Sequence, residues 1–155
     1  MNDLSKHFPL LDLGDGDLAV PGHLFCHVSI FDHWLDEQEA DHPLMCYSTA
    51  LAAGALDEYM LGEQKFLKFY SLLSKGGVIC NRPGPLRIFE AMTPELEHIF
   101  VDSLREKRFM DVYFKGTGVR VIGRYDRTDL VIADSQEELR SFQLKSHDFG
   151  LFELN

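Results

Sequence analysis

The sequence has few of the features that would place it in an easily recognised class. Its three cysteines (Cys26, Cys46 and Cys80) are an odd number at wide spacing and form no Cys-x-x-Cys motif. This pattern argues against a disulfide framework and is typical of reduced thiols in a cytoplasm. No stretch approaches the roughly 20 apolar residues of a membrane span. The first residues, Met1 to Lys6, lack the apolar core of a signal peptide. We therefore expect a cytoplasmic protein with no membrane partner.

Basic residues are scarce in the first part of the chain. Residues 1–64 contain twelve acidic residues and one basic residue, Lys6, for a net charge of −11. Residues 65–155 contain thirteen acidic and fourteen basic residues, or +1, so nearly the whole net charge of −10 comes from the first part. An acidic surface repels nucleic acid and attracts basic partners, so we expect a basic protein partner and no nucleic-acid partner. The acidity also has a simpler interpretation, which is solubility alone.

Signatures of familiar enzymes are absent. Gly14-Asp15-Gly16 and Gly116-Thr117-Gly118 are each Gly-x-Gly, but neither extends to the dinucleotide-binding fingerprint, and there is no P-loop. The metalloprotease, hydrolase and kinase motifs are also missing. These absences favour a protein that acts by binding, with no catalytic residue and no cofactor to assign.

The material for a folded core is present. The chain is 45% hydrophobic with 12 Phe, and its 155 residues suit one globular domain, residues 1–155. The predicted fold class is α+β, an antiparallel β-meander in the C-terminal third packed with about four helices. The predicted helices cover residues 48–60, 63–73, 93–107 and 135–144, with a break at Gly62. The predicted strands cover residues 10–13, 18–20, 23–31, 78–80, 86–90, 110–115, 119–125, 129–133 and 149–154.

Histidines and cysteines gather in one region, which raises the question of a metal site. The candidate ligands are His23, Cys26, His27, Asp32, His33, His42 and Cys46. Residues 23–31 are rich in β-branched and aromatic types, and on a strand His23 and His27 are about 13 Å apart, too far to share a metal. We therefore expect no metal here. A pocket lined by His23, His27 or Cys80 is the alternative, which would make the protein a small enzyme or ligand-binding domain.

Two further groups of residues suggest chemistry. Cys80 ends a short predicted strand near Arg82 and Arg87, which could activate a thiol, although a buried, inert thiol is the commoner case. A basic patch with aromatic side chains could form beside the C-terminal hairpin, as on surfaces that bind single-stranded nucleic acid. Ordinary surface salt bridges explain these basic residues more simply, and the acidic partners would be Glu95, Glu97, Glu106, Asp111 and Asp126. The members of the patch are Arg82, Arg87, Arg105, Lys107, Arg108, Lys115, Tyr113, Arg120, Arg124, Tyr125 and Arg127.

The most specific feature is a tryptophan among acidic residues. Trp34 is the only tryptophan, and the candidate partner-binding residues around it are Asp32, Asp36, Glu37, Glu39 and Asp41. An aromatic anchor surrounded by charge is typical of protein-binding surfaces, although Trp34 could instead close the core beneath an acidic loop.

The leading functional hypothesis is therefore a non-enzymatic protein-binding module. One concrete version is a bacterial immunity or antitoxin-type protein that covers the cationic cleft of a nuclease toxin. A homo-oligomer that pairs through an edge strand is a further possibility.

Overall fold

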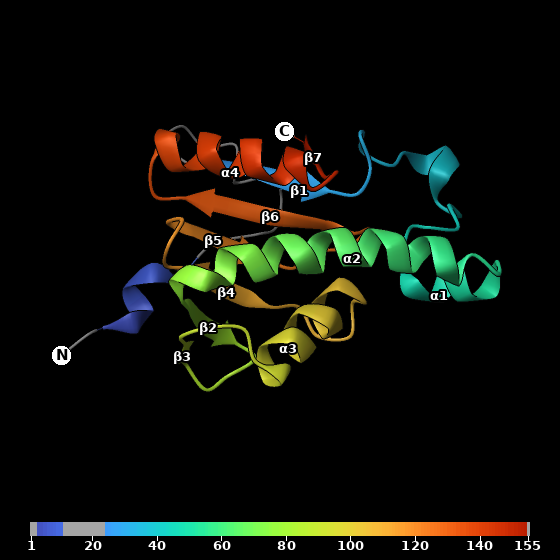
Figure 1. The fold of residues 1–155 in the computed structure, drawn as a ribbon. Coiled ribbons are helices and arrows are strands. Elements are labelled where there is room, and N and C mark those ends of the chain that lie inside the picture. Colours follow the sequence, from blue (N-terminus) through green and yellow to red (C-terminus); the bar gives the residue numbers. More distant parts are fainter. Residues whose placement is uncertain (1–2, 11–23, 155) are drawn as a thin grey trace.

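The fold is a seven-stranded antiparallel sheet with helices packed on one face (Figure 1). It was obtained as a computed structural model, which describes residues 3–10 and 24–154. The α-helices of these residues are α1 (Tyr47–Ala52), α2 (Leu56–Leu73), α3 (Pro94–Leu104) and α4 (Gln136–Asp148). The strands are β1 (Phe25–Ser29), β2 (Val78–Arg82), β3 (Arg87–Phe89), β4 (Asp111–Phe114), β5 (Val119–Ile122), β6 (Thr128–Ala133) and β7 (Phe152–Leu154). The predicted α+β class is confirmed.

The sheet order is β3-β2-β4-β5-β6-β1-β7. Strands β4, β5 and β6 form the predicted meander, with Tyr113 opposite Arg120 and Val121 opposite Val131. β1 inserts between β6 and β7, which places Cys26 opposite Val131 and His27 opposite Leu154. The sheet therefore joins a strand from the first fifth of the chain to strands from its end.

The core lies between the sheet and the helices α2, α3 and α4. The helical spacing of Phe66, Phe69, Tyr70 and Leu73 predicts one buried face, and all four side chains are buried. Alternate strand residues, such as Cys26 and Val28 in β1, face the same core. Tyr70, which is wholly buried, donates its hydroxyl proton to Asp129 Oδ2 at 2.6 Å, so this buried carboxylate has a partner.

The predicted helix break at Gly62 is wrong. The chain breaks instead at Gly54, where φ is +69°, and α2 runs without interruption through Gly62. A Cβ atom at Gly62 would lie 1.8 Å from Ile30 Cδ1 and 2.5 Å from Arg127 Nη2. Glycine here makes room for the side chains of Ile30 and Arg127, and a sequence pattern does not distinguish this role from a helix break.

Other element ends differ by a few residues. α3 begins after the predicted cap Thr93 but ends at Leu104, three residues early, and Glu106 just beyond it has φ of +61°. α4 begins after Ser135 and continues to Asp148 rather than ending at Leu144. The strands predicted over residues 10–13 and 18–20 fall largely outside the described residues.

The second face of the sheet is contacted by the N-terminal segment, residues 3–10, which includes the 3-10 helix η1 (Leu4–His7). His7 stacks on Tyr113 of β4 with ring centroids 4.0 Å apart. Arg120 of β5 donates from Nη1 to the carbonyl oxygen of Pro9 at 2.8 Å, and its guanidinium lies over the ring of Phe8. These contacts fix the segment against the middle of the sheet.

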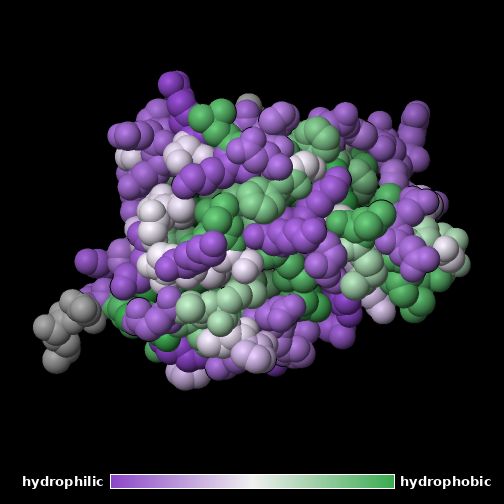
Figure 2. Space-filling model, viewed as in Figure 1, coloured by the Kyte–Doolittle hydropathy of each residue, from purple (hydrophilic) through white to green (hydrophobic). Residues whose placement is uncertain are grey.

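The helix-covered face is mostly polar (Figure 2). Apolar surface gathers at the end of the molecule formed by α1 and the start of α2. Leu51 of α1 and Leu61 of α2, at this end, are 58% and 68% exposed. Among the described residues, no helix is both long and apolar enough to cross a bilayer.

Candidate partner-binding loop

The residues predicted to bind a partner lie on a single loop, residues 31–42, which we call the acidic loop. It connects β1 to the segment before α1 and projects at the end of the molecule formed by α1 and the start of α2 (Figure 1). The rings of Phe31 and His42, its first and last residues, meet edge to face with centroids 5.1 Å apart. The acidic loop is thus a closed, compact loop of the kind that often carries function.

The acidic loop is held in shape by its own side chains. Asp36 Oδ1 accepts hydrogen bonds from the backbone N–H groups of Gln38 and Glu39, and Glu39 reaches back to the N–H of Asp36. This capping box starts the 3-10 helix η3 (Glu37–Glu39). Two of the predicted binding residues, Asp36 and Glu39, therefore fix the loop's backbone.

His33 ties the two halves of the acidic loop together. Its Nδ1 lies 2.7 Å from Asp32 Oδ1, and its Nε2 lies 2.9 Å from Glu39 Oε2. Hydrogen bonds to Asp32 and then to Glu39 raise the pKa of His33 to about 9. The same contacts lower the pKa values of both carboxyl groups.

The loop consequently keeps a strong negative charge at neutral pH. Its five carboxylates, less the one positive charge of His33, give a net charge of −4. Glu37 and Asp41 are exposed, and no side-chain partner is found for either among the described residues. These two carboxylates are therefore available to a partner without disturbing the contacts that shape the loop.

The base of the acidic loop is anchored to the buried part of the molecule. Arg127, just before β6, is only 3% exposed and donates to the carbonyl oxygens of Tyr59 and Leu44. Its guanidinium also lies 4.0 Å from the centre of the Tyr59 ring. Thr49 of α1 donates from Oγ1 to the carbonyl oxygen of Pro43. The segment that follows the loop is therefore fixed from two sides.

Trp34 is neither a core residue nor fully exposed. Its ring meets the ring of His27 edge to face at 4.8 Å, and 49% of its surface remains exposed. The alternative in which Trp34 closes the core is therefore wrong. The arrangement positions a large aromatic side chain at the surface, two positions along the chain from each of the exposed residues Asp32 and Asp36.

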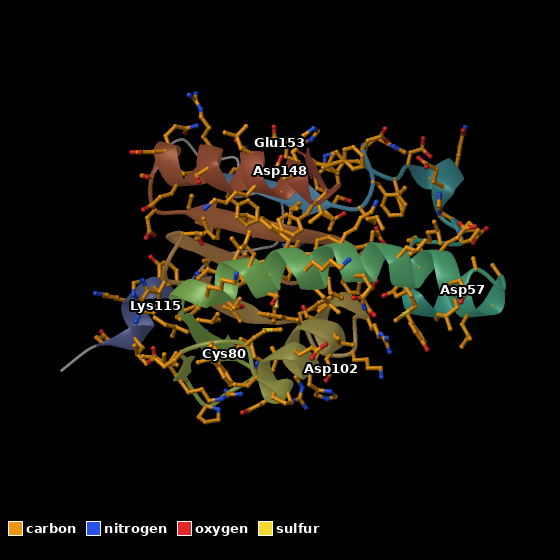
Figure 3. The ribbon with its side chains drawn as sticks, in the orientation of Figure 1. Asp57, Cys80, Asp102, Lys115, Asp148 and Glu153 are labelled. Carbon is orange, nitrogen blue, oxygen red and sulfur yellow. The ribbon has the colours of Figure 1, made fainter. Side chains whose placement is uncertain are left out.

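The negative charge extends beyond the loop. The first turn of α2 contains Asp57 and Glu58, both outside any ion pair found among the described residues. Figure 3 shows Asp57 at the outer end of α2, on the same end of the molecule as α1. Together with the exposed Leu51 and Leu61, this end offers both acidic and apolar surface.

The described residues do not form the other sites that the sequence suggested, a reactive cysteine and a His/Cys cluster. Cys80 is fully buried in the core (Figure 3), and burial raises the pKa of its thiol, which argues against a nucleophile. Its thiol donates hydrogen bonds to the carbonyl oxygens of Arg82 and Pro83. His23 lies outside the described residues, and those described hold no group of three His, Cys, Asp or Glu residues placed to bind a metal.

The predicted basic patch is divided among separate environments. Arg87, Arg105 and Arg120 form ion pairs with Glu95, Glu63 and Asp111, and Arg127 is buried at the loop base. The interpretation as surface salt bridges is therefore confirmed for Glu95, whereas the pair with Asp111 is buried and Glu63 is not among the predicted partners. Arg82 and Arg124 make no side-chain hydrogen bond or ion pair with any described residue, and both line a cavity on the second face of the sheet.

That cavity is the feature that sequence reasoning missed. It measures about 630 Å³, and neither His27 nor Cys80 lines it, so the predicted His/Cys-lined pocket is not the one formed there. The available signal was the row of arginines in and around β5, but their separation into paired and unpaired groups depends on strand register. Comparison of the chain with protein-family models, with curated proteins and with solved structures finds no match.

Proposed function

We propose that this protein is a non-enzymatic binding module whose acidic loop docks onto a basic protein. The observation that supports this most directly is Trp34, half-exposed on a loop that is fixed by its own hydrogen bonds and carries a net charge of −4. Tryptophan is among the residues that contribute most to protein interfaces. A loop that is already ordered loses little conformational entropy on binding.

The charge distribution supports a basic partner in particular. Exposed carboxylates on the acidic loop and on the first turn of α2 lie at one end of the molecule, without a lysine or arginine between residues 7 and 64. Such a field accelerates association with a cationic surface and is weakened by salt. The apolar surface of Leu51 and Leu61 supplies area for a dry contact beside the charged one.

The concrete form of the proposal is an immunity or antitoxin-type protein that covers the cationic cleft of a nuclease toxin. This form rests on the acidity, the small size and the absence of catalytic motifs. It requires a partner whose binding surface is rich in lysine and arginine, as nucleic-acid-binding clefts are.

The structure indicates which substitutions test the proposal cleanly. Glu39 shapes the loop through His33, so reversing its charge would change both the fold of the loop and its field. Glu37 and Asp41 have no such role, so E37K/D41K changes the local charge by +4 with the loop contacts intact. E97K/E137K makes the same change of charge at exposed positions on α3 and α4 and serves as the matched control.

The experiment is co-purification from native-host lysate followed by binding kinetics with the recovered basic protein. For that protein we expect E37K/D41K to slow association about tenfold or more at low salt, whereas the control variant changes it little. W34A should mainly speed dissociation, at a cost of about 2 kcal/mol or more, as expected of an anchor residue. Equal effects of the loop and control variants, or no effect of W34A, would contradict the proposal. Toxicity of the isolated partner, relieved by this chain, tests the immunity form.

A further inference from the structure

The cavity on the second face of the sheet has the properties of a small-molecule site. It lies between the N-terminal segment, β4, β5 and the residues that follow β5, and its volume of about 630 Å³ is within the range of known ligand pockets. Phe8, Pro9 and Ile122 supply apolar wall, and no residue of the acidic loop is among those that line the cavity. Nothing in the proposed function uses this cavity.

Positive charge is concentrated there in a protein of net charge −10. The lining residues include Arg82, Arg120 and Arg124 with one carboxylate, that of Asp111, so the cavity has a net charge of +2. Arg120 and Asp111 neutralise one another through two hydrogen bonds of 2.8 Å. Arg82 and Arg124 are the excess cations, and neither has a side-chain partner among the described residues.

Asn81, Asp111 and Arg120 form a hydrogen-bonded polar network in the lining of the cavity. Asn81 Nδ2 donates to Asp111 Oδ2 at 3.1 Å, which leaves the amide oxygen of Asn81 as an acceptor. The Asp111 and Arg120 side chains are only 8% and 9% exposed, and Arg120 also holds the carbonyl oxygen of Pro9. This network keeps one wall of the cavity, the N-terminal segment, in position relative to the sheet.

An aromatic pair forms part of the lining. The rings of Phe109 and Tyr125 meet edge to face at 4.9 Å, and Tyr125 is 65% exposed. Both residues line the cavity that contains Arg82 and Arg124. Flat apolar groups pack well against aromatic rings, and guanidinium groups bind carboxylates and phosphates in a two-point geometry.

We propose that this cavity binds a small aromatic anion, with its carboxylate or phosphate held by Arg82 and Arg124 and its ring against Phe109 and Tyr125. The amide oxygen of Asn81 supplies an acceptor for a donor group on the ligand. The ligand class follows from two arginines without a side-chain partner among the described residues, together with the aromatic pair and the apolar wall of the same cavity. It does not depend on the docking of a basic protein to the acidic loop.

The test is an amide-shift NMR titration of the full chain with three probes, namely benzoate, phenyl phosphate and the uncharged benzyl alcohol. We expect one of the two anions to shift the amides of Phe109, Ile122 and Tyr125, with benzyl alcohol at least about tenfold weaker, the effect of one charge-assisted hydrogen bond. Stronger binding of benzoate identifies a carboxylate ligand, and stronger binding of phenyl phosphate identifies a phosphate ligand.

Variants locate the interaction. R82Q/R124Q should weaken binding of the preferred anion by about tenfold or more, while R140Q, which removes an exposed arginine of α4, should leave it unchanged. E37K/D41K should bind the anion as wild type does, so failure of the loop proposal and failure of this one give different results. Four results would each overturn the proposal. In the wild-type titration these are equal binding of the anion and the alcohol, amide shifts only at residues away from the cavity, or no shifts at millimolar concentrations of the probes. In the variant, the result would be that R82Q/R124Q binds the anion as tightly as wild type.

Discussion

Replacing Arg120 with methionine is the most informative test of what holds the second face of the sheet. Arg120 donates from Nε and Nη2 to the two carboxylate oxygens of Asp111, at 2.8 Å each, and both side chains are nearly buried. The substitution leaves the Asp111 carboxylate in place with the Asn81 amide as its remaining donor among the described residues. It also removes the donor to the carbonyl oxygen of Pro9.

The expected loss is large because a buried charge is left without its partner. Breaking a buried ion pair by removing one member costs about 3–5 kcal/mol, and the lower part of this range applies because both side chains keep some contact with solvent. Loss of the hydrogen bond to Pro9 adds about 1 kcal/mol. We expect R120M to lower the free energy of unfolding by about 4 kcal/mol, and the thermal midpoint by about 10 °C for a domain of this size.

Urea unfolding measures this directly, because a change of midpoint at constant slope reports stability alone. R140M, on the exposed surface of α4, should change the free energy of unfolding by less than about 0.5 kcal/mol. D111N/R120M should recover part of the loss, because the remaining amide carries no charge to bury. A double variant no more stable than R120M would refute the reasoning, since it would show that the stranded carboxylate is not the cause.

Three titration and reactivity predictions follow from the pKa shifts. By NMR, His33 should titrate with a pKa of about 9, so the contacts that depend on its charge are complete below the ordinary pKa of 6.5 and are lost as the pH rises through about 9. Tryptophan fluorescence should change in the same pH range. A His33 pKa near 6.5 would contradict this prediction. Burial raises the pKa of Asp129 to about 6, so its contribution to stability is complete below pH 3.8, the ordinary pKa, and is lost as the pH rises through about 6. The difference in free energy of unfolding between D129N and wild type should therefore change between these pH values. A constant difference would contradict the raised pKa. Burial raises the thiol pKa of Cys26 and Cys80, whereas hydrogen bonds outweigh burial in the half-buried Cys46 and lower its pKa. A thiol reagent should therefore modify Cys46 alone in the folded protein and all three cysteines in urea. Rapid modification of Cys26 or Cys80 in the folded protein would contradict the structure.

Elements with strong local signals are where sequence and structure agree best. Thr93 followed by Pro94 predicts the start of α3, and Ser135 predicts the start of α4, because caps depend on residues within one turn. The glycines of residues 116–118 predict the hairpin between β4 and β5 for the same reason. In the acidic loop, Asp36 followed by Glu39 carries a capping signal that fits the short helix found there.

Features that depend on distant segments could not be read in this way. Gly62 gives the same local signal whether it ends a helix or makes room for Ile30 and Arg127, and only the folded structure shows the second case. The position of β1 between β6 and β7 joins residues about a hundred positions apart. Arg82 and Arg124, which have no side-chain partner among the described residues, lie about forty positions apart in sequence and come together because the sheet order places β4 between β2 and β5.

The position of β1 has a consequence for synthesis of the chain. β1 carries the acidic loop at its end, yet both strands that flank it, β6 and β7, are made after residue 127. The arginine that anchors the base of the loop, Arg127, is made at the same late stage. During translation the loop therefore emerges early but has no fixed base until β6 leaves the ribosome, and the sheet beside it is complete only with β7. A nascent or truncated chain that lacks β6 and β7 would display the acidic residues without the strands that flank β1, so the binding proposed for the acidic loop requires synthesis of the chain through Leu154.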